Sequence, residues 1–289
     1  MRVLVTGAAG MLGQDVVALL RGRGHEVTAA GRAEADVTDA ASLAAAVPGH
    51  DAVVNCAAHT AVDAAQTDVA AAELLNATAP RLLGEACAAA GARLVHVSTD
   101  YVFSGDADLD ASGEPLPYAE DAPVAPRSVY GRTKADGEAA ARAAQPDALV
   151  VRTAWLYGAG GGCFPKTIAR AARERGAVSV VDDQVGQPTW TADVARVVAD
   201  LLEVAAPAGT YHATSAGRTS WFGFTRRVLG SAGLDPAVAS PTTSAAFVRP
   251  APRPAWSVLG HGALVAAGVE PIGDWAERWD AAAAAVLDG

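Results

Sequence analysis

The start of the chain carries the pattern that most restricts its fold. Val3, Leu4 and Val5 are β-prone, Gly7, Gly10 and Gly13 follow at three-residue spacing, and 11–20 places its apolar side chains near one face of a helix. In such a strand, glycine turn and helix, the turn lets the backbone approach a pyrophosphate. The helix N-terminus then offers free N–H groups and the positive end of its dipole. The order of these parts meets the context that a dinucleotide site requires.

The same alternation of strands and helices continues along the chain. Alanine-rich stretches, which favour helix, separate short and continuously apolar runs. This pattern predicts α/β architecture, a Rossmann-type doubly wound parallel sheet covered on both faces. We expect strands at 2–6, 26–30, 52–56, 93–98, 148–153 and 178–181, and helices at 11–22, 40–46, 68–90 and 128–144.

The pattern changes after residue 154. A glycine-rich loop at 158–162 and a later cluster of prolines interrupt the alternation. We expect a dinucleotide-binding core at 1–154, joined by about 189–214. A smaller C-terminal substrate-binding subdomain would be built from 155–188 and 215–289.

Composition excludes several classes of protein. The 289 residues are 51% hydrophobic and 19% charged, as in a globular protein with a sizeable core. The net charge of −10 argues against a nucleic-acid partner. There is no apolar run long enough to span a membrane, and the first strand begins at once, so we expect neither a membrane partner nor a signal peptide. Three cysteines without metal spacing indicate reduced thiols in a cytoplasmic protein.

Tyr130 and Lys134 lie four residues apart in the run YGRTK. On a helix they would share one face, one turn apart. An ammonium beside a phenol favours the phenolate, so we expect Lys134 to lower the Tyr130 pKa toward neutral pH, where an acid/base catalyst is most effective. Thr99 ends a predicted strand and could hydrogen-bond the same substrate oxygen. By contrast, His96 is flanked by apolar strand residues, and we expect it to be a satisfied core histidine.

The end of the second predicted strand bears on the choice of cofactor. An NAD-preferring site usually places a carboxylate there, for the ribose 2′-hydroxyl. Here Gly31 and Arg32 follow the strand, and Arg32 could meet a 2′-phosphate. We therefore expect NADPH, with NADH as the alternative. Asp36 and Val37 are placed near the adenine by position alone.

At this point the chain resembles a known family. It is similar to the extended short-chain dehydrogenase/reductases, and within them to the dTDP-4-dehydrorhamnose reductase family. The motifs lie in matching order between residues 3 and 259: VTGAAGMLG, VNCAAHTAVD, LLNATAP, VSTDYVFSGD, YAEDAPVAPRSVYGRTKADGE, VRTAWLYG, VDDQVGQPT and RPAWSVL. Among them VSTDYVF, DDQVGQPT and the RP-x-x-S motif go beyond the general superfamily.

The resemblance implies a function and its residues. The reaction would be the NADPH-dependent reduction of the C4 ketone of a dTDP-4-keto-6-deoxy sugar, dTDP-4-dehydrorhamnose to dTDP-rhamnose. The implied catalytic residues are Thr99, Tyr130 and Lys134. The cofactor would contact Gly7, Gly10, Met11, Leu12, Gly13, Ala57, Ala58, Thr60, Asn76, Tyr130 and Lys134. The sugar nucleotide would contact Val62, Asp100, Tyr101, Phe103, Trp155 and Arg253, and Lys166 and Arg253 are our choices for its diphosphate.

Several positions depart from the family pattern. Cys163 stands where asparagine is common, Gly260 where an acid or asparagine is usual, and Trp190 where a small residue is frequent. Some members carry glutamates that bind magnesium at a dimer interface. Matching acids cannot be placed here, so we expect no metal and leave a homodimer open.

Three alternatives stay open. The substrate could be a related keto sugar of antibiotic glycosylation, as for a dihydrostreptose synthase, or the chain could be a 4-epimerase. It could also be a non-catalytic regulatory subunit that keeps the pocket, although the intact trio argues against this. A 4,6-dehydratase is disfavoured because Tyr101 stands where those enzymes place a second acid after the threonine.

Overall fold

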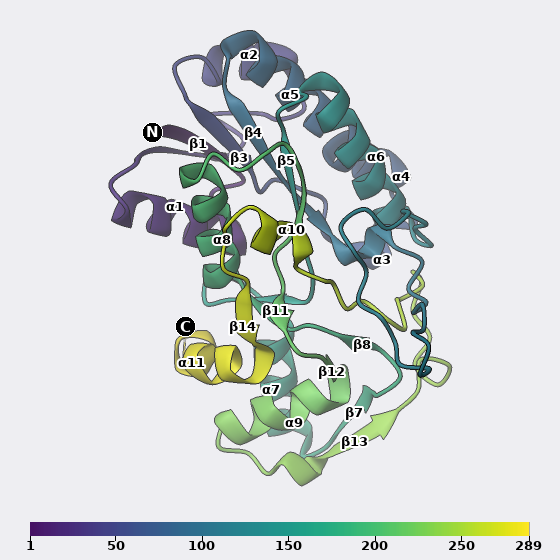
Figure 1. Cartoon of the computed structure of the whole chain (residues 1–289). Coiled ribbons are helices and arrows are strands. Elements are labelled where there is room, and N and C mark those ends of the chain that lie inside the picture. The colour runs from purple at the N-terminus through teal and green to yellow at the C-terminus, as the bar shows by residue number, and fades with distance from the viewer. Residues whose placement is uncertain (289) are drawn as a thin grey trace.

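A six-stranded parallel sheet forms the centre of the larger lobe (Figure 1). The computed structural model describes residues 1–288. The strand order is β10-β5-β4-β3-β1-β2, and each neighbouring pair is parallel, so the predicted doubly wound fold is confirmed. The strands are β1 (Arg2–Thr6), β2 (Glu26–Ala30), β3 (Ala52–Asn55), β4 (Arg93–Thr99), β5 (Leu149–Thr153) and β10 (Gly209–His212).

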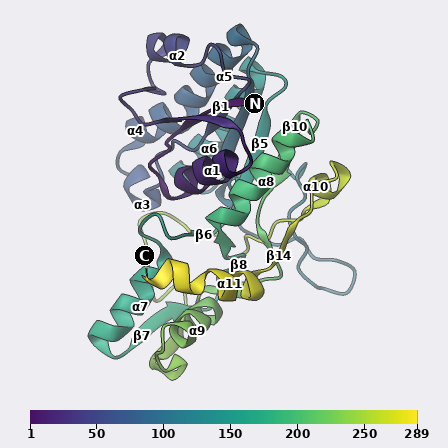
Figure 2. The same ribbon diagram turned by 90° about the vertical axis from the view of Figure 1, so that its left-hand side faces the viewer.

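Helices cover both faces of this sheet (Figure 2). The side chains of Val3 and Val5 point to the face covered by α1 (Met11–Gly22) and α8 (Thr191–Glu203), and Leu4 points to the other. Because both faces are buried, the strands are apolar throughout rather than alternating. The second face is covered by α2 (Ala40–Ala46), α5 (Ala79–Ala90) and α6 (Val129–Ala144).

Two elements differ from expectation. The strand β7 (Val178–Val181) forms but pairs with β13 (Ala239–Thr242), outside the large sheet, whose sixth strand is instead β10. The helix expected over 68–90 is divided into α4 (Val69–Glu73), a π-helical segment at Leu74–Thr78, and α5. Pro80 has no N–H to donate to the carbonyl four residues before it, so a regular α-helix is interrupted at this point.

The smaller lobe lies in the lower part of the view in Figure 1. It has its own aromatic core. Tyr157, Phe224 and Trp279 are fully buried and lie edge to face or tilted, with ring centroids 5.3–5.7 Å apart. The helices are α7 (Phe164–Arg175), α9 (Trp221–Ser231) and α11 (Trp275–Asp288).

Short elements connect the lobes and border the sheet. Within residues 1–288 no helix combines the length and apolar character that crossing a bilayer demands. The short helices are α3 (Val62–Ala65) and α10 (Gly262–Ala266), with 3₁₀ turns at Asp100–Val102 and Pro236–Val238. The short strands are β6 (Leu156–Tyr157), β8 (Val185–Gly186), β9 (Thr189–Trp190), β11 (Ser215–Ala216), β12 (Thr219–Ser220) and β14 (Ile272–Asp274).

Candidate active site

A cleft of about 680 Å³ opens beyond the carboxyl ends of β1, β3, β4 and β5. Open α/β sheets bind their ligands at this edge. The cleft gathers thirteen of the residues expected at the site: Gly10, Met11, Leu12, Gly13, Ala58, Thr60, Val62, Thr99, Asp100, Tyr101, Tyr130, Lys134 and Trp155.

The glycine turn is built for close approach of backbone. Gly7 has a φ of +65°, and a Cβ there would lie 2.7 Å from the backbone nitrogen of Ala57. A Cβ on Gly13 would lie 2.3 Å from the carbonyl oxygen of Gly7. Among the described residues, no side chain caps the N-terminus of α1, so its first N–H groups remain available at the cleft. This cradle fits the pyrophosphate of a dinucleotide.

Helix α6 carries Tyr130 and Lys134 on the face that borders the cleft. The helix begins after Ser128, whose Oγ accepts a hydrogen bond from the Gly131 N–H at 3.0 Å. Because the two residues are one turn apart and α6 packs along β4, their side chains reach the same end of the strand as Thr99. The structure thus brings together the three residues expected to be catalytic.

The expectation that Lys134 lowers the pKa of Tyr130 is wrong for the free protein. Burial raises the pKa of the Tyr130 phenol to about 12, a hydrogen bond with Thr99 lowers it in part, and the charge of Asp100 raises it further. The phenol therefore keeps its proton at neutral pH. This is the state that a proton donor must have before the reaction.

The hydrogen-bonding neighbours of the Lys134 amine belong to β4 and do not include the phenol of Tyr130. Its Nζ donates to the carbonyl oxygen of Val97 at 2.6 Å and lies 3.3 Å from Nε2 of His96. The side chain is almost fully buried, and burial lowers the pKa of Lys134 to about 8, although Glu138 acts to raise it. His96 is buried, as expected of a core residue, but it also contacts Lys134.

Thr99 links the phenol to a buried carboxyl group. The Thr99 hydroxyl donates to Oδ1 of Asp100 at 2.9 Å and accepts the N–H of Tyr101 at 3.2 Å. Burial raises the pKa of Asp100 to about 6, against the opposing effect of this hydrogen bond from Thr99. The other carboxyl oxygen, Oδ2, has no hydrogen-bond partner within residues 1–288. A hydrogen bond with the side chain of Ser257 also acts to lower the pKa of this carboxyl group.

Trp155 forms an aromatic wall of the cleft. Its backbone has a φ of +47°, an unusual conformation for a bulky residue. The indole stacks on that of Trp221 with ring centroids 3.6 Å apart and an interplanar angle of 8°. Phe164 packs on the same Trp221 ring at 4.4 Å. The neighbouring aromatic rings hold Trp155 in this strained position.

Some expected cofactor residues lie outside the lining of the cleft. Arg32 is 84% exposed, and its Nε donates to Asp36 at 3.0 Å. Hydrogen bonds from Thr38 and Arg32 lower the pKa of Asp36 to about 2. Asn76 is buried, where its side chain bonds both backbone groups of His59 and the hydroxyl of Thr133. Gly7, Val37 and Ala57 also lie outside the lining.

The expected diphosphate residues do not meet in this cleft. Nζ of Lys166 donates to the carbonyl oxygen of Ala159 at 2.7 Å, in the glycine-rich loop. Arg253 pairs with Asp63 at 2.7 Å and borders a small hollow beside Tyr101. Phe103, expected at the sugar, stays in the core, stacked on Tyr118 with ring centroids 4.2 Å apart.

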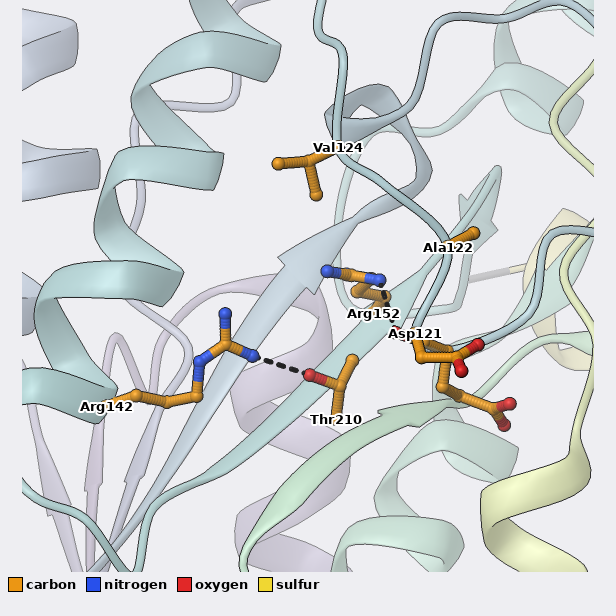
Figure 3. A pocket seen from close by; sticks show the side chains of 7 residues that line it. Asp121, Ala122, Val124, Arg142, Arg152 and Thr210 are labelled. Atoms are coloured by element: carbon orange, nitrogen blue, oxygen red, sulfur yellow. Dashed lines mark hydrogen bonds between the residues drawn. The ribbon is translucent and has the colours of Figure 1, made fainter.

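A second hollow, of about 450 Å³, lies beside β10 and the C-terminal half of α6 (Figure 3). Its two arginine side chains are already bonded to neighbours. The buried Arg152 forms an ion pair with Glu138 at 2.7 Å, and Arg142 donates to the hydroxyl of Thr210 at 2.7 Å. Both arginines that line this hollow therefore already have partners.

Sequence reasoning missed several residues that line the cleft. Cys56, Ser98 and Thr153 carry no chemical signature of their own, but each lies at the end of a predicted strand. Strand order alone could therefore have placed them. Gly160, Gly161 and Gly162 also line the cleft, and their signal was the glycine-rich loop.

Comparison with known proteins gives matches over nearly the whole chain. The family described as RmlD substrate binding domain matches residues 1–287. A Streptomyces antibioticus protein named as a probable dTDP-4,6-dihydroxy-2-methyloxan-3-one 4-ketoreductase is 50% identical over 283 residues, 95% of this chain and 92% of the relative. A dTDP-4-dehydrorhamnose reductase of Streptomyces griseus is 49% identical over 281 residues, 95% of this chain and 90% of the relative. The crystal structure of a Bacillus anthracis dTDP-4-dehydrorhamnose reductase in complex with NADP is similar with a TM-score of 0.91 at 32% identity, covering 97% of this chain and 98% of that one.

Proposed function

The chain belongs to the family described as RmlD substrate binding domain, which includes dTDP-4-dehydrorhamnose reductases, and on this premise we propose that it reduces the C4 ketone of a dTDP-4-keto-6-deoxy sugar with NADPH. It is an oxidoreductase of the extended short-chain dehydrogenase/reductase type. The observation that carries the proposal is a single cleft in which the glycine turn of β1 and α1 meets Thr99, Tyr130 and Lys134.

In the proposed reaction the cofactor and the side chains of the cleft have different roles. Reduced nicotinamide supplies a hydride to the ketone carbon when it is bound. Tyr130, protonated in the free protein, donates its proton to the carbonyl oxygen. The Thr99 hydroxyl donates to Asp100 in the free protein and would turn to the same oxygen, where it stabilises developing charge. Lys134, charged below its pKa of about 8, stabilises the phenolate that remains.

We assign the sugar nucleotide to the side of the cleft that faces the smaller lobe. Asp100 lines this side with a buried carboxyl group, and Trp155 offers a flat apolar surface. Val62 and Tyr101 complete this side. The smaller lobe, 155–188 with 215–289, is proposed as the sugar-nucleotide subdomain. Arg253, Lys166 and Phe103 would need to change their present contacts to take part.

The proposed substrate is dTDP-4-dehydrorhamnose. A related 4-keto sugar is the second candidate, because the Streptomyces antibioticus relative is named for a different ketone. A cytoplasmic location remains a proposal, consistent with free thiols at Cys56, Cys87 and Cys163. A homodimer is likewise only a prediction from the sequence.

The proposed function is tested by NADPH oxidation, followed by its absorbance, with purified protein and a panel of dTDP-4-keto sugars. The product's C4 configuration is then read by NMR. Consumption of NADPH with one keto sugar supports the reductase and identifies the substrate. Tight NADPH binding without turnover of any sugar in the panel would favour the regulatory-subunit alternative.

Arg32 gives a separate test of cofactor choice. We expect Arg32→Ala to weaken NADPH binding about tenfold, or about 1.4 kcal/mol, because a charged hydrogen bond to the 2′-phosphate is lost from an exposed position. NADH binding should stay nearly unchanged. Both dissociation constants can be measured by nicotinamide fluorescence. Arg81→Ala, at an exposed ion pair on α5, is the matched control, and equal losses for the two cofactors would refute the assignment.

A further inference from the structure

A buried chain of polar side chains runs across three strands to the catalytic lysine. It starts at Thr6, the last residue of β1 before the glycine turn, whose hydroxyl donates to Oδ1 of Asn55 at 2.8 Å. The amide nitrogen of Asn55 lies 3.1 Å from Nδ1 of His96, and Nε2 of His96 lies 3.3 Å from Nζ of Lys134. The side chains of these four residues are at most 2% exposed.

The hydrogen bonds of Asn55 determine which group donates and which accepts along this series of side chains. Its Oδ1 accepts from the Thr6 hydroxyl and also from the backbone N–H of Ala57 at 3.1 Å. A backbone N–H can only donate, so the amide oxygen must face it. The amide NH₂ of Asn55 therefore points at His96 and donates to Nδ1.

The tautomer of His96 follows from this direction. An Nδ1 atom that accepts a hydrogen bond carries no proton, so the neutral ring carries its proton on Nε2. The ring is neutral because burial, and then the charge of Lys134, hold the pKa of His96 well below its usual range. Nε2–H thus faces Nζ of Lys134.

This arrangement favours one protonation state of the lysine. An ammonium group has three donors and no acceptor, so it cannot accept a hydrogen from Nε2. An uncharged amine has a lone pair and can accept it, while it still donates to the carbonyl oxygen of Val97. The contact is therefore favourable with the amine and unfavourable with the ammonium.

We propose that His96 is a positioning residue that stabilises the uncharged amine of Lys134 by donating its Nε2–H to Nζ. The proposal rests on the proposed reductase function for its catalytic meaning. When Tyr130 gives its proton to the substrate oxygen, a phenolate and an ammonium remain. Transfer of one proton from the ammonium to the phenolate leaves both groups neutral. His96 then stabilises the amine so formed.

Other groups also act on Lys134, and each stays in place when His96 is changed. Cys56 faces it from the loop after β3, and Tyr130 and Glu138 lie one turn away on α6. Burial lowers the pKa of the lysine, whereas Glu138 and then Cys56 act to raise it. Against this background, His96→Leu removes the Nε2–H donor to Lys134, and with it the Nδ1 acceptor of Asn55.

The sequence allows Lys134 to be titrated directly. Lys134 and Lys166 are the only two lysines in the chain, so ¹³C-lysine labelling gives two side-chain signals in NMR spectra. Lys166 serves as the internal reference. In the free protein we expect His96→Leu to raise the pKa of Lys134 by about 0.5 to 1, the worth of one lost hydrogen bond to the amine.

His212→Leu is the matched control. His212 is another buried histidine at the end of a sheet strand, bonded to the carbonyl oxygen of Gly260 rather than to Lys134. It should leave the Lys134 pKa unchanged. An unchanged or lower pKa in His96→Leu would overturn the proposal, since a lower value would mean that His96 accepts from the ammonium.

A second measurement needs no core substitution. ¹⁵N-histidine NMR of the unaltered protein should show His96 as the Nε2–H tautomer, with its signal assigned through whichever of His96→Gln and His96→Leu folds. An Nδ1–H tautomer would overturn the proposal. Both measurements use the free protein, so they decide the role of His96 even if the reductase assay fails.

Discussion

Tyr130→Phe is expected to lose about 10²- to 10⁴-fold in turnover while it keeps most of its affinity for NADPH. The substitution removes only the hydroxyl that gives its proton to the substrate oxygen. The ring remains packed edge to face on Tyr101, with centroids 5.5 Å apart, so the shape of the cleft is retained. Single-turnover reduction and NADPH fluorescence titration would separate the two effects.

The matched control for this substitution is Tyr211→Phe. Tyr211 lies on β10, outside the cleft lining, and its hydroxyl donates to the carbonyl oxygen of Pro207 at 2.7 Å. Turnover should be unchanged in the control. Near-normal turnover in Tyr130→Phe would remove the tyrosine from the role of proton donor and leave Thr99 or a solvent molecule as the alternative.

The order in which Tyr130 and Lys134, the proposed catalytic groups, lose their protons is inverted in this fold. A free tyrosine loses its proton before a free lysine. Here the pKa of Tyr130 is raised to about 12 and that of Lys134 is lowered to about 8, in both cases chiefly by burial. Between these values the phenol is protonated and the lysine is uncharged. Turnover should therefore fall as pH rises through 8 because the ammonium is lost, well before the phenol ionises.

Much of the fold could be predicted because local and global signals agree. The short apolar runs predict buried strands, and the glycine turn predicts a strand that leads into a helix. Together these patterns predict the parallel sheet that the structure has. The place of β7 could not be predicted in this way. Its apolar run resembles the sheet strands, but it pairs with β13 in the smaller lobe, a long-range choice that no local pattern encodes.

The residues that form the site could be predicted from the sequence, but their pKa values could not. Spacing and strand ends placed Thr99, Tyr130 and Lys134 in one cleft. The pKa of Tyr130 depends on burial and on its neighbours Thr99 and Asp100, which meet it only when β4 and α6 pack together. For the same reason the contact between His96 and Lys134 had no signal in the sequence.

Glu138→Ala is expected to lower the free energy of unfolding by about 3–5 kcal/mol. Glu138 and Arg152 form two parallel hydrogen bonds, at 2.9 and 2.7 Å, and their side chains are only 1% and 3% exposed. Removal of the carboxylate leaves a guanidinium charge in the core between α6 and β5. Urea unfolding followed by circular dichroism would measure the loss.

Two further variants show whether the loss comes from an unpaired charge. Glu85→Ala breaks an exposed ion pair with Arg81 on α5 and should cost about 0.5 kcal/mol or less. The double change Glu138→Met with Arg152→Met removes both charges, so it should be more stable than Glu138→Ala alone. If the double variant were the less stable, the loss in Glu138→Ala would not come from the unpaired guanidinium charge. Glu138 also raises the pKa of Lys134, so its loss should move the alkaline fall in turnover to lower pH, which ties this buried pair to catalysis as well as to stability.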